Sequence, residues 1–255
     1  MSLVFAVMYR EYRIRTSGLM WMFFDLLVPM TYLLLFGIGL DRAFTEGVTT
    51  QGSAVPYDAF FLAGVVAMAN FGIAINTSYG FFVDRDNGIF YEFLTYPMTR
   101  GQLLVGKIVF NCLLSLVQGV LTLLLGVLIL KIEIQWEMLP LVLISIVLAT
   151  AGWFFALSTI ALRIRRNDVF NTLLNMLYFV LMFTSTLFYP LDGAPSWLHT
   201  ASMVNPLTWH TDVLRFATIG LGTPATILWE AGAFCVFVFA GFWFAVRTLQ
   251  TAVLK

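Results

Sequence analysis

Long uncharged and mostly apolar runs dominate the chain. Four segments carry no charged residue over 23 or 25 positions: 59–83, 108–130, 138–162 and 169–191. About 20 apolar residues, each rising about 1.5 Å along a helix, cross the roughly 30 Å hydrocarbon core of a membrane. Each of these runs therefore predicts a membrane-spanning helix.

Two further apolar runs contain one acidic residue each, Asp25 and Glu230. One acid costs about 2.5–3.5 kcal/mol at the centre of a bilayer and less near its edge, so neither acid excludes a span. The pattern predicts an all-α integral membrane protein. It has six transmembrane helices, over approximately residues 22–40, 59–83, 108–130, 138–162, 169–190 and 228–246.

Composition supports a membrane protein and excludes several other classes. Of the 255 residues, 60% are hydrophobic and 11% charged, and the mean hydropathy is +0.89, whereas soluble domains carry about 25% charged residues. The 14 basic and 14 acidic residues balance, so a nucleic-acid partner is not expected. Both cysteines lie in apolar runs, which argues against a disulfide framework or a cysteine-based metal site.

The basic residues are distributed unevenly between the two sides that six spans create. One side receives 11 of the 14: Arg10, Arg13, Arg15, Arg85, Arg100, Lys107, Arg163, Arg165, Arg166, Arg247 and Lys255. The other side receives Arg42, Lys131 and Arg215. The positive-inside rule predicts that both termini are cytoplasmic, in a multi-pass protein of the cell (inner) membrane.

Residues 3–17 are expected to form a helix at the cytoplasmic interface. Phe5, Met8, Tyr9 and Tyr12 share one face, and neighbouring arginines suit anionic headgroups. A second apolar stripe, which includes Val7, is consistent with contact to another protein segment. A simple membrane anchor remains the alternative.

The stretch 84–107 keeps apolar side chains on the cytoplasmic side of the membrane. These are Phe90, Phe93, Leu94 and Met98. A short amphipathic helix offered to a partner protein explains them, and a segment lying flat in the headgroups explains them equally well. The chain turns at Pro97, and Thr99 is a suitable start for the next helix.

The last external loop, 192–227, is unusually apolar. Asn205 followed by Pro206 predicts a helix N-cap and first turn, and Gly220 or Gly222 can end that helix. A short helix that re-enters the outer leaflet fits this pattern, as does a loop on the membrane surface. At 36 residues the loop is too short for a soluble catalytic domain. We therefore expect one transmembrane domain over 1–255 and no nucleotide-binding domain.

Two features of the sequence resemble chemical sites, a phosphate-binding loop and a histidine pair, but neither is well supported. Residues 101–107 match the first seven positions of a phosphate-binding loop, but Ile108 replaces the required Ser or Thr, and the stretch opens a span. Lys107 is therefore interpreted as an interfacial cation. His199 and His210 are too far apart in sequence to indicate a metal or acid–base site on their own, and no metal is expected.

Polar residues within the spans form two groups. One lies on the second span and the other on the fifth: Asn70, Asn76 and Thr77, then Asn171, Asn175 and Tyr178. They either join helices or line a substrate pathway. Asp25 either pairs with Arg13 or Arg15 or lines a pathway. The spans lack the chains of charged residues that ion-coupled carriers usually need.

Several short motifs follow one another along nearly the whole chain. They are Pro29 with Leu35-Phe36-Gly37, Arg85-Asp86-Asn87-Gly88-Ile89, Glu92-Phe93-Leu94, Pro97-Met98-Thr99-Arg100, Gly106-Lys107, Asn205-Pro206-Leu207-Thr208-Trp209, and Asp212 with Arg215. This order resembles the membrane subunits of type-2 ABC exporters, which include permeases for lipid-linked polysaccharides, Nod factors and daunorubicin-like drugs. Tyr96 departs from the small residue common before Pro97 in that family.

The resemblance implies a permease that works as a homodimer with two separate ABC ATPase subunits, which bind the ATP and magnesium. The segment that docks on the ATPase would contain Phe90, Glu92, Phe93, Leu94, Pro97, Met98 and Arg100. An external gate would contain Asn205, Pro206, Trp209, Asp212 and Arg215. The expected cargo is hydrophobic or amphipathic. A membrane-embedded lipid-modifying enzyme and an ion-coupled secondary transporter remain alternatives.

Overall fold

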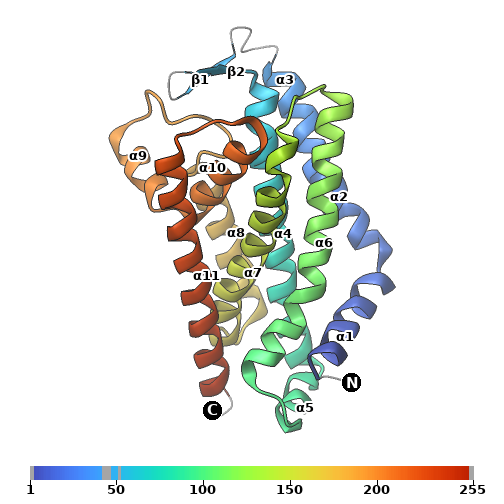
Figure 1. Ribbon diagram of the computed structural model, residues 1–255. Coiled ribbons are helices and arrows are strands. Elements are labelled where there is room, and N and C mark those ends of the chain that lie inside the picture. The colour runs from blue at the N-terminus through green and yellow to red at the C-terminus, as the bar shows by residue number, and fades with distance from the viewer. Residues whose placement is uncertain (1–2, 42–46, 51–52, 253–255) are drawn as a thin grey trace.

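The computed structural model describes residues 3–41, 47–50 and 53–252, which form an elongated bundle of helices (Figure 1). The first half of the bundle contains α1 (Leu3–Ser17), α2 (Leu19–Tyr32), α3 (Ile38–Asp41), α4 (Tyr57–Asp86), α5 (Ile89–Thr95) and α6 (Arg100–Ile129). The second half contains α7 (Leu139–Arg163), α8 (Asn167–Phe183), α9 (Ser196–Met203), α10 (Pro206–Ile219) and α11 (Pro224–Ala252).

Both ends of the described chain lie at one end of the bundle, together with α5 (Figure 1). We call this the terminal end. The opposite end carries α9, α10 and the only two strands of the described residues, β1 (Val48–Thr50) and β2 (Ser53–Val55), which pair antiparallel. The hairpin was not expected in an all-α chain. Its strands contain the β-branched residues Val48, Thr49, Thr50 and Val55, which favour extended backbone.

Five helical segments of the described chain are long and apolar enough to cross a membrane. They are Phe23–Leu40, Tyr57–Asp86, Arg100–Ile129, Trp136–Arg163 and Pro224–Thr251. These agree in position with five of the six predicted spans. The fifth predicted span, 169–190, is shorter than expected, because α8 ends at Phe183 after 17 residues.

The first span contains a break in regular geometry. Pro29 lies inside α2, and a short π-helix, η1 (Leu33–Gly37), follows. Proline has no N–H, so the carbonyl of Asp25 loses its partner within the helix. The side-chain amide of Gln118 on α6 donates to that carbonyl instead. The proline therefore creates a hydrogen-bonding link between two helices.

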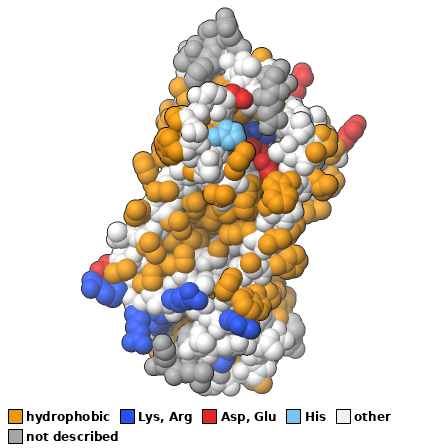
Figure 2. Space-filling model, turned by 90° about the vertical axis from the view of Figure 1, so that its left-hand side faces the viewer, with side chains coloured by type: hydrophobic (Ala, Val, Ile, Leu, Met, Phe, Trp, Pro, Cys, Tyr) orange, Lys and Arg blue, Asp and Glu red, His pale blue; other side chains and the backbone are white. Residues whose placement is uncertain are grey.

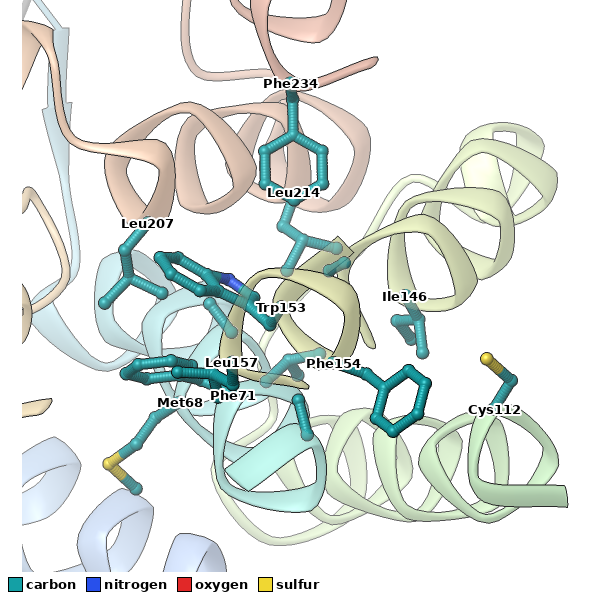
Figure 3. Close-up of a cluster of buried hydrophobic side chains, with 14 of the residues drawn as sticks. Met68, Phe71, Cys112, Ile146, Trp153, Phe154, Leu157, Leu207, Leu214 and Phe234 are labelled. Atoms are coloured by element: carbon teal, nitrogen blue, oxygen red, sulfur yellow. The ribbon is translucent and has the colours of Figure 1, made fainter. Parts of the chain in front are cut away.

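Helix α4 runs through the centre of the bundle, and every side chain from Phe61 to Phe71 is buried. It packs on α6, α7 and α10, and α7 packs in turn on α11. Figure 3 shows the core at this junction, where Phe71 of α4, Trp153 of α7 and Leu207 of α10 converge. The centroids of the Phe71 and Trp153 rings lie 4.4 Å apart.

Local sequence signals determine several helix ends. Thr99 and Gln102 form a reciprocal capping box at the start of α6, as the sequence predicts. Asn205 caps α10 by accepting a hydrogen bond from the Leu207 N–H at 2.9 Å, Pro206 is its first residue, and Gly220 ends it. The predicted helix in the last loop is therefore confirmed.

Candidate functional site

Helix α5 forms a short protrusion at the terminal end of the molecule (Figure 1). It begins after Gly88, whose φ of 75° reverses the chain direction at the end of α4, and it stops where Tyr96 adopts an extended conformation. The α6 cap at Thr99 follows directly. The chain therefore holds α5 between two defined turns at the tips of two long helices.

The two faces of α5 differ in what they contact. Phe90 is 3% exposed, and its ring centroid lies 6.4 Å from that of Phe81 on α4. Phe93 lies beneath Arg10 of α1, with 5.3 Å between the guanidinium carbon and the ring centroid. Phe90 was expected to face a partner. It is instead in the core, so it anchors the segment.

The exposed surface of this segment is made by other residues. Tyr91 and Tyr96 are 62% and 56% exposed, and Glu92 and Pro97 are also exposed. Sequence reasoning missed the two tyrosines, although their mixed polar and apolar character suits a surface that a partner covers. Met98 and Arg100 are half-buried, and the side chain of Leu94 lies outside the described residues.

A buried cluster of four charged groups lies above α5. The Lys107 ammonium, 1% exposed, lies 3.1 Å from Glu11 Oε1 and 2.5 Å from Asp84 Oδ2. Arg10 pairs with the same two acids. Two cations and two anions balance, which a buried charge requires. The cluster joins α1, α4 and α6, and it corrects the interpretation of Lys107 as an interfacial cation.

Helix α1 is packed against α6 at Gly106. A Cβ atom there would lie 2.7 Å from the Val7 Cβ, closer than van der Waals contact allows. Val7 is 2% exposed, whereas Tyr9 on the other side of α1 is 51% exposed. The second apolar stripe of α1 therefore contacts another segment, α6, which is one of the two alternatives that the sequence leaves open.

Asp25 forms an ion pair with Arg15, which is one of the two alternatives that the sequence leaves open. Arg15 Nη1 lies 3.3 Å from Asp25 Oδ2, and the Asn76 amide donates to Oδ1 at 3.1 Å. Arg15 also donates to Asn111 on α6 at 3.2 Å. These contacts tie α1, α2, α4 and α6 together.

Asn70 joins two helices. It is fully buried on α4 and accepts a hydrogen bond from Ser115 of α6 at 2.7 Å. Thr150 of α7 donates to the same serine at 2.7 Å. Such interhelical hydrogen bonds are worth about 0.6 kcal/mol each on average in membranes.

Two cavities are lined in part by α8, the inner one together with α1 and α4 and the outer one together with α2 and the hairpin. The inner cavity, of about 530 Å³, is nearer the terminal end, and its lining includes Asn76, Thr77 and Asn171 together with the buried ion cluster. The outer groove, of about 670 Å³, is lined mainly by aromatic side chains: Tyr32, Phe36, Tyr57, Tyr178, Phe179, Phe183, Phe188 and Tyr189.

Helix α8 contributes to both cavities. Asn171 lines the inner cavity and donates to Asn167 Oδ1 at 2.6 Å, while Tyr178 lines the outer groove and stacks on Phe71 at 5.4 Å. Asn175 lies between them in sequence and is exposed. The predicted polar face of α8 therefore contributes to both the inner cavity and the outer groove.

At the opposite end, Arg215 of α10 holds the segment that follows α8. This guanidinium is 2% exposed and bonds to Asp212 at 2.8 Å, to the Phe60 carbonyl at 3.1 Å and to the Leu187 carbonyl at 3.2 Å. The Asn205 amide donates to the Leu181 carbonyl at 2.8 Å. Asn205 therefore satisfies a carbonyl in the last turn of α8, and Arg215 satisfies one in the irregular segment that follows it.

The remaining residues of the expected external gate are structural. Pro206 begins α10, and the Trp209 indole donates to the Met203 carbonyl at 2.7 Å, which joins α10 to α9. All five gate residues therefore lie in or beside one helix pair.

The two histidines do not form one site. His199 and Asp212 line a small cavity of about 260 Å³ with Arg215 and Glu230. His210 is instead buried and stacks on Phe234, with its ring centroid at 5.6 Å. Burial lowers the pKa of His210 to about 3, because the charged imidazolium would lose its hydration. Within the described residues, no group of three metal-ligating side chains is found.

Comparisons with known proteins agree with one another. The family model described as ABC-2 type transporter matches residues 2–219. Proteins named transport permease ycf38 are 28% identical over 195 residues in Cyanophora paradoxa and 22% identical over 189 residues in Porphyra purpurea. The matched regions cover 75% and 74% of this chain, and 65% and 64% of those relatives.

Proposed function

The chain belongs to the ABC-2 type transporter family and is a multi-pass membrane protein, and we propose that it is the permease subunit of an ATP-driven exporter. The proposed cargo is a hydrophobic or amphipathic molecule: a drug, a lipid or a lipid-linked glycan. The observation that carries the proposal is the protruding segment formed by α5 and Tyr96, in which Tyr91 and Tyr96 are exposed and Phe90 is a buried anchor.

We propose that the exposed face of α5 docks into a separate ABC ATPase subunit. Tyrosine is favoured at protein interfaces because it combines a large contact area with a hydroxyl group. Phe90 holds α5 against α4, and Phe93 holds it against Arg10 of α1. The ion cluster ties α1 and α4 in turn to α6. A movement of the ATPase would therefore reach the transmembrane helices through rigid contacts rather than through a loose loop.

ATP and magnesium are assigned to that partner. The only resemblance to a nucleotide site in this chain, residues 101–107, lies within α6, and its lysine is already engaged by two acids. A phosphate-binding loop needs its backbone N–H groups and its lysine to be free to bind phosphate.

We propose six spans, with α8 as the fifth in order and with α9 and α10 as short re-entrant helices. The 17 residues of α8 rise about 26 Å, close to the hydrocarbon thickness. An even number of spans agrees with the position of both termini at one end (Figure 1). The excess of Lys and Arg at that end favours a cytoplasmic location in the cell (inner) membrane.

The inner cavity and the outer groove are the proposed substrate pathway. The inner cavity has charged and polar side chains among apolar ones, whereas the outer groove is mainly aromatic, so together they suit a molecule with a polar head and an apolar body. We propose that a second copy of the chain closes this flank, because α8, which lines both the inner cavity and the outer groove, and α2 expose apolar side chains. Asp212 and Arg215 would secure the external gate.

Two alternatives make different predictions. A lipid-modifying enzyme would use His199 and Asp212, which share a cavity, whereas His210 lies apart from them. An ion-coupled carrier would transport without an ATPase and would be sensitive to uncouplers. Neither alternative explains the exposed surface of α5.

The decisive experiment is co-purification with a candidate partner ATPase. We expect Glu92→Arg to reduce association at least tenfold, because it reverses a charge on the exposed face of α5. Glu137→Arg is the matched control, since Glu137 is equally exposed but lies between α6 and α7, at the opposite end. Undiminished association of Glu92→Arg would remove the docking assignment.

A further inference from the structure

A fourth cavity, of about 660 Å³, opens at the terminal end beside α5 and the last turns of α7 and α11. Its polar lining comes from Arg85, Arg163, Arg165, Tyr91, Thr248 and Thr251. No acidic residue is among the described residues that line it. Three guanidinium groups without a carboxylate make this cavity strongly electropositive.

The three arginines are not equivalent. Arg85 is held in the wall, because Nη1 donates to the Ile164 carbonyl at 2.9 Å and the guanidinium lies 5.2 Å from the Phe82 ring centroid. Arg163 and Arg165 are exposed, and neither forms an ion pair with any described residue. Two free guanidinium groups next to a fixed one repel each other unless an anion separates them.

A hydroxyl-bearing side chain of α11 also lines the cavity. Thr248 is 6% exposed and belongs to the cavity lining. A threonine hydroxyl can donate one hydrogen bond. Thr248 therefore suits a ligand that brings an acceptor oxygen into the cavity.

The position of the cavity relative to the membrane indicates which source of anionic groups lies closest to it. On α11, Trp243 is 48% exposed, and Arg247 lies 4.1 Å above its ring, an arrangement typical of the membrane interface. Thr248 is five residues further along the helix, or about 7.5 Å. Each headgroup layer is about 5–7.5 Å thick, so Thr248 lies at the outer edge of that layer. Figure 2 shows basic side chains gathered below a broad apolar band on this flank.

We propose that this cavity binds the phosphate group of an anionic membrane lipid. Guanidinium groups bind phosphate in bidentate fashion, and basic pockets between helices on the cytoplasmic side suit anionic headgroups. Because Tyr91 of α5 lines the cavity, the bound lipid contacts the segment to which we assign ATPase docking. The binding site itself does not depend on that assignment.

The test is native mass spectrometry of the purified full-length protein, titrated with phosphatidylglycerol, phosphatidylcholine or inorganic phosphate. We expect phosphatidylglycerol to bind at least tenfold more tightly than phosphatidylcholine. The double variant Arg163→Gln/Arg165→Gln should lose about tenfold in that affinity, and Thr248→Val a few-fold. Arg166→Gln is the matched control, because Arg166 pairs with Asp168 outside the cavity and should leave binding unchanged.

Three results would overturn the proposal. The first is equal binding of the two lipids, or wild-type affinity in the double variant. The second is tighter binding of inorganic phosphate than of the lipid, which would indicate a soluble anion. The third is unchanged lipid binding with loss of ATPase association in the double variant, which would make this surface a protein contact.

Discussion

Arg215 and Lys107 are both almost fully buried, and each connects segments distant in the sequence. Arg215 bonds to carbonyls of Phe60 and Leu187, and Lys107 pairs with Glu11 and Asp84. A buried charge is tolerated only when its partners compensate for lost hydration. At the scale of single residues, these charges therefore determine how neighbouring helices are held.

Arg215→Lys tests this role at the opposite end. Lysine keeps the charge but lacks the planar fork that reaches Asp212 and three carbonyls at once. We expect the stability to fall by about 2–4 kcal/mol, measured as the apparent melting temperature in detergent. Arg166→Lys, at an exposed site, serves as the control. Equal melting temperatures of the two variants would contradict the assignment.

The burial of His210 predicts that the stability of the folded protein depends on pH. Its pKa is lowered to about 3 in the folded protein but is about 6.5 in an unfolded chain. As pH falls below about 6.5, the unfolded chain binds the proton first, so stability is lost with decreasing pH. At pH 5 the loss is about 2 kcal/mol.

The pH effect is measured by comparing the wild type with His210→Phe, which retains the stacking on Phe234. The apparent melting temperature of the wild type should fall more steeply between pH 7.5 and pH 5. Parallel profiles of the two proteins would show that His210 does not carry the effect.

At the scale of elements, α1 and α5 act as one unit at the terminal end. Arg10 of α1 lies over Phe93 of α5, and the same residue enters the ion cluster with Asp84. The interface helix is therefore part of the docking apparatus that we propose, rather than a separate membrane anchor. Its position depends on the close approach at Gly106.

Gly106→Ala tests the α1–α6 contact. The new methyl group would lie 2.7 Å from Val7 Cβ, so α1 must shift, at a cost of about 1–3 kcal/mol. Gly232→Ala is the control, because no atom lies within 4 Å of the place that its new methyl group would occupy and alanine favours the helix. We expect lower thermal stability and weaker ATPase coupling for Gly106→Ala alone. Equal behaviour of the two variants would contradict a tight contact.

At the scale of the whole molecule, the two ends have different chemistry. The terminal end combines the ion cluster, the arginine-lined cavity and α5, whereas the opposite end combines the hairpin with α9 and α10 (Figure 1). The inner cavity lies beside α1 and α4 nearer the terminal end, and the outer groove reaches the hairpin at the opposite end. This arrangement suits the proposed permease, in which the ATPase docks at the terminal end and the external gate opens at the opposite end.

Single-cysteine labelling tests the orientation in a variant lacking Cys112 and Cys235. We expect a membrane-impermeant maleimide to label Glu137→Cys in intact cells, and Thr95→Cys only after the membrane is permeabilised. Both positions are exposed, so accessibility depends on the side of the membrane. Labelling of Thr95→Cys in intact cells would reverse the proposed orientation.

The long helices and several of their ends can be predicted from local sequence alone. Continuous apolar runs predict spans, and the caps at Thr99 and Asn205 act within one helical turn, so neighbours along the chain are sufficient. The packing of distant segments was needed to show that Phe90 faces the core, that Lys107 is buried, and that α8 stops at Phe183. The reason is physical. Lipid and protein interior are both apolar, so hydrophobicity does not distinguish the two faces of such a helix, and the partners of these groups come from distant segments.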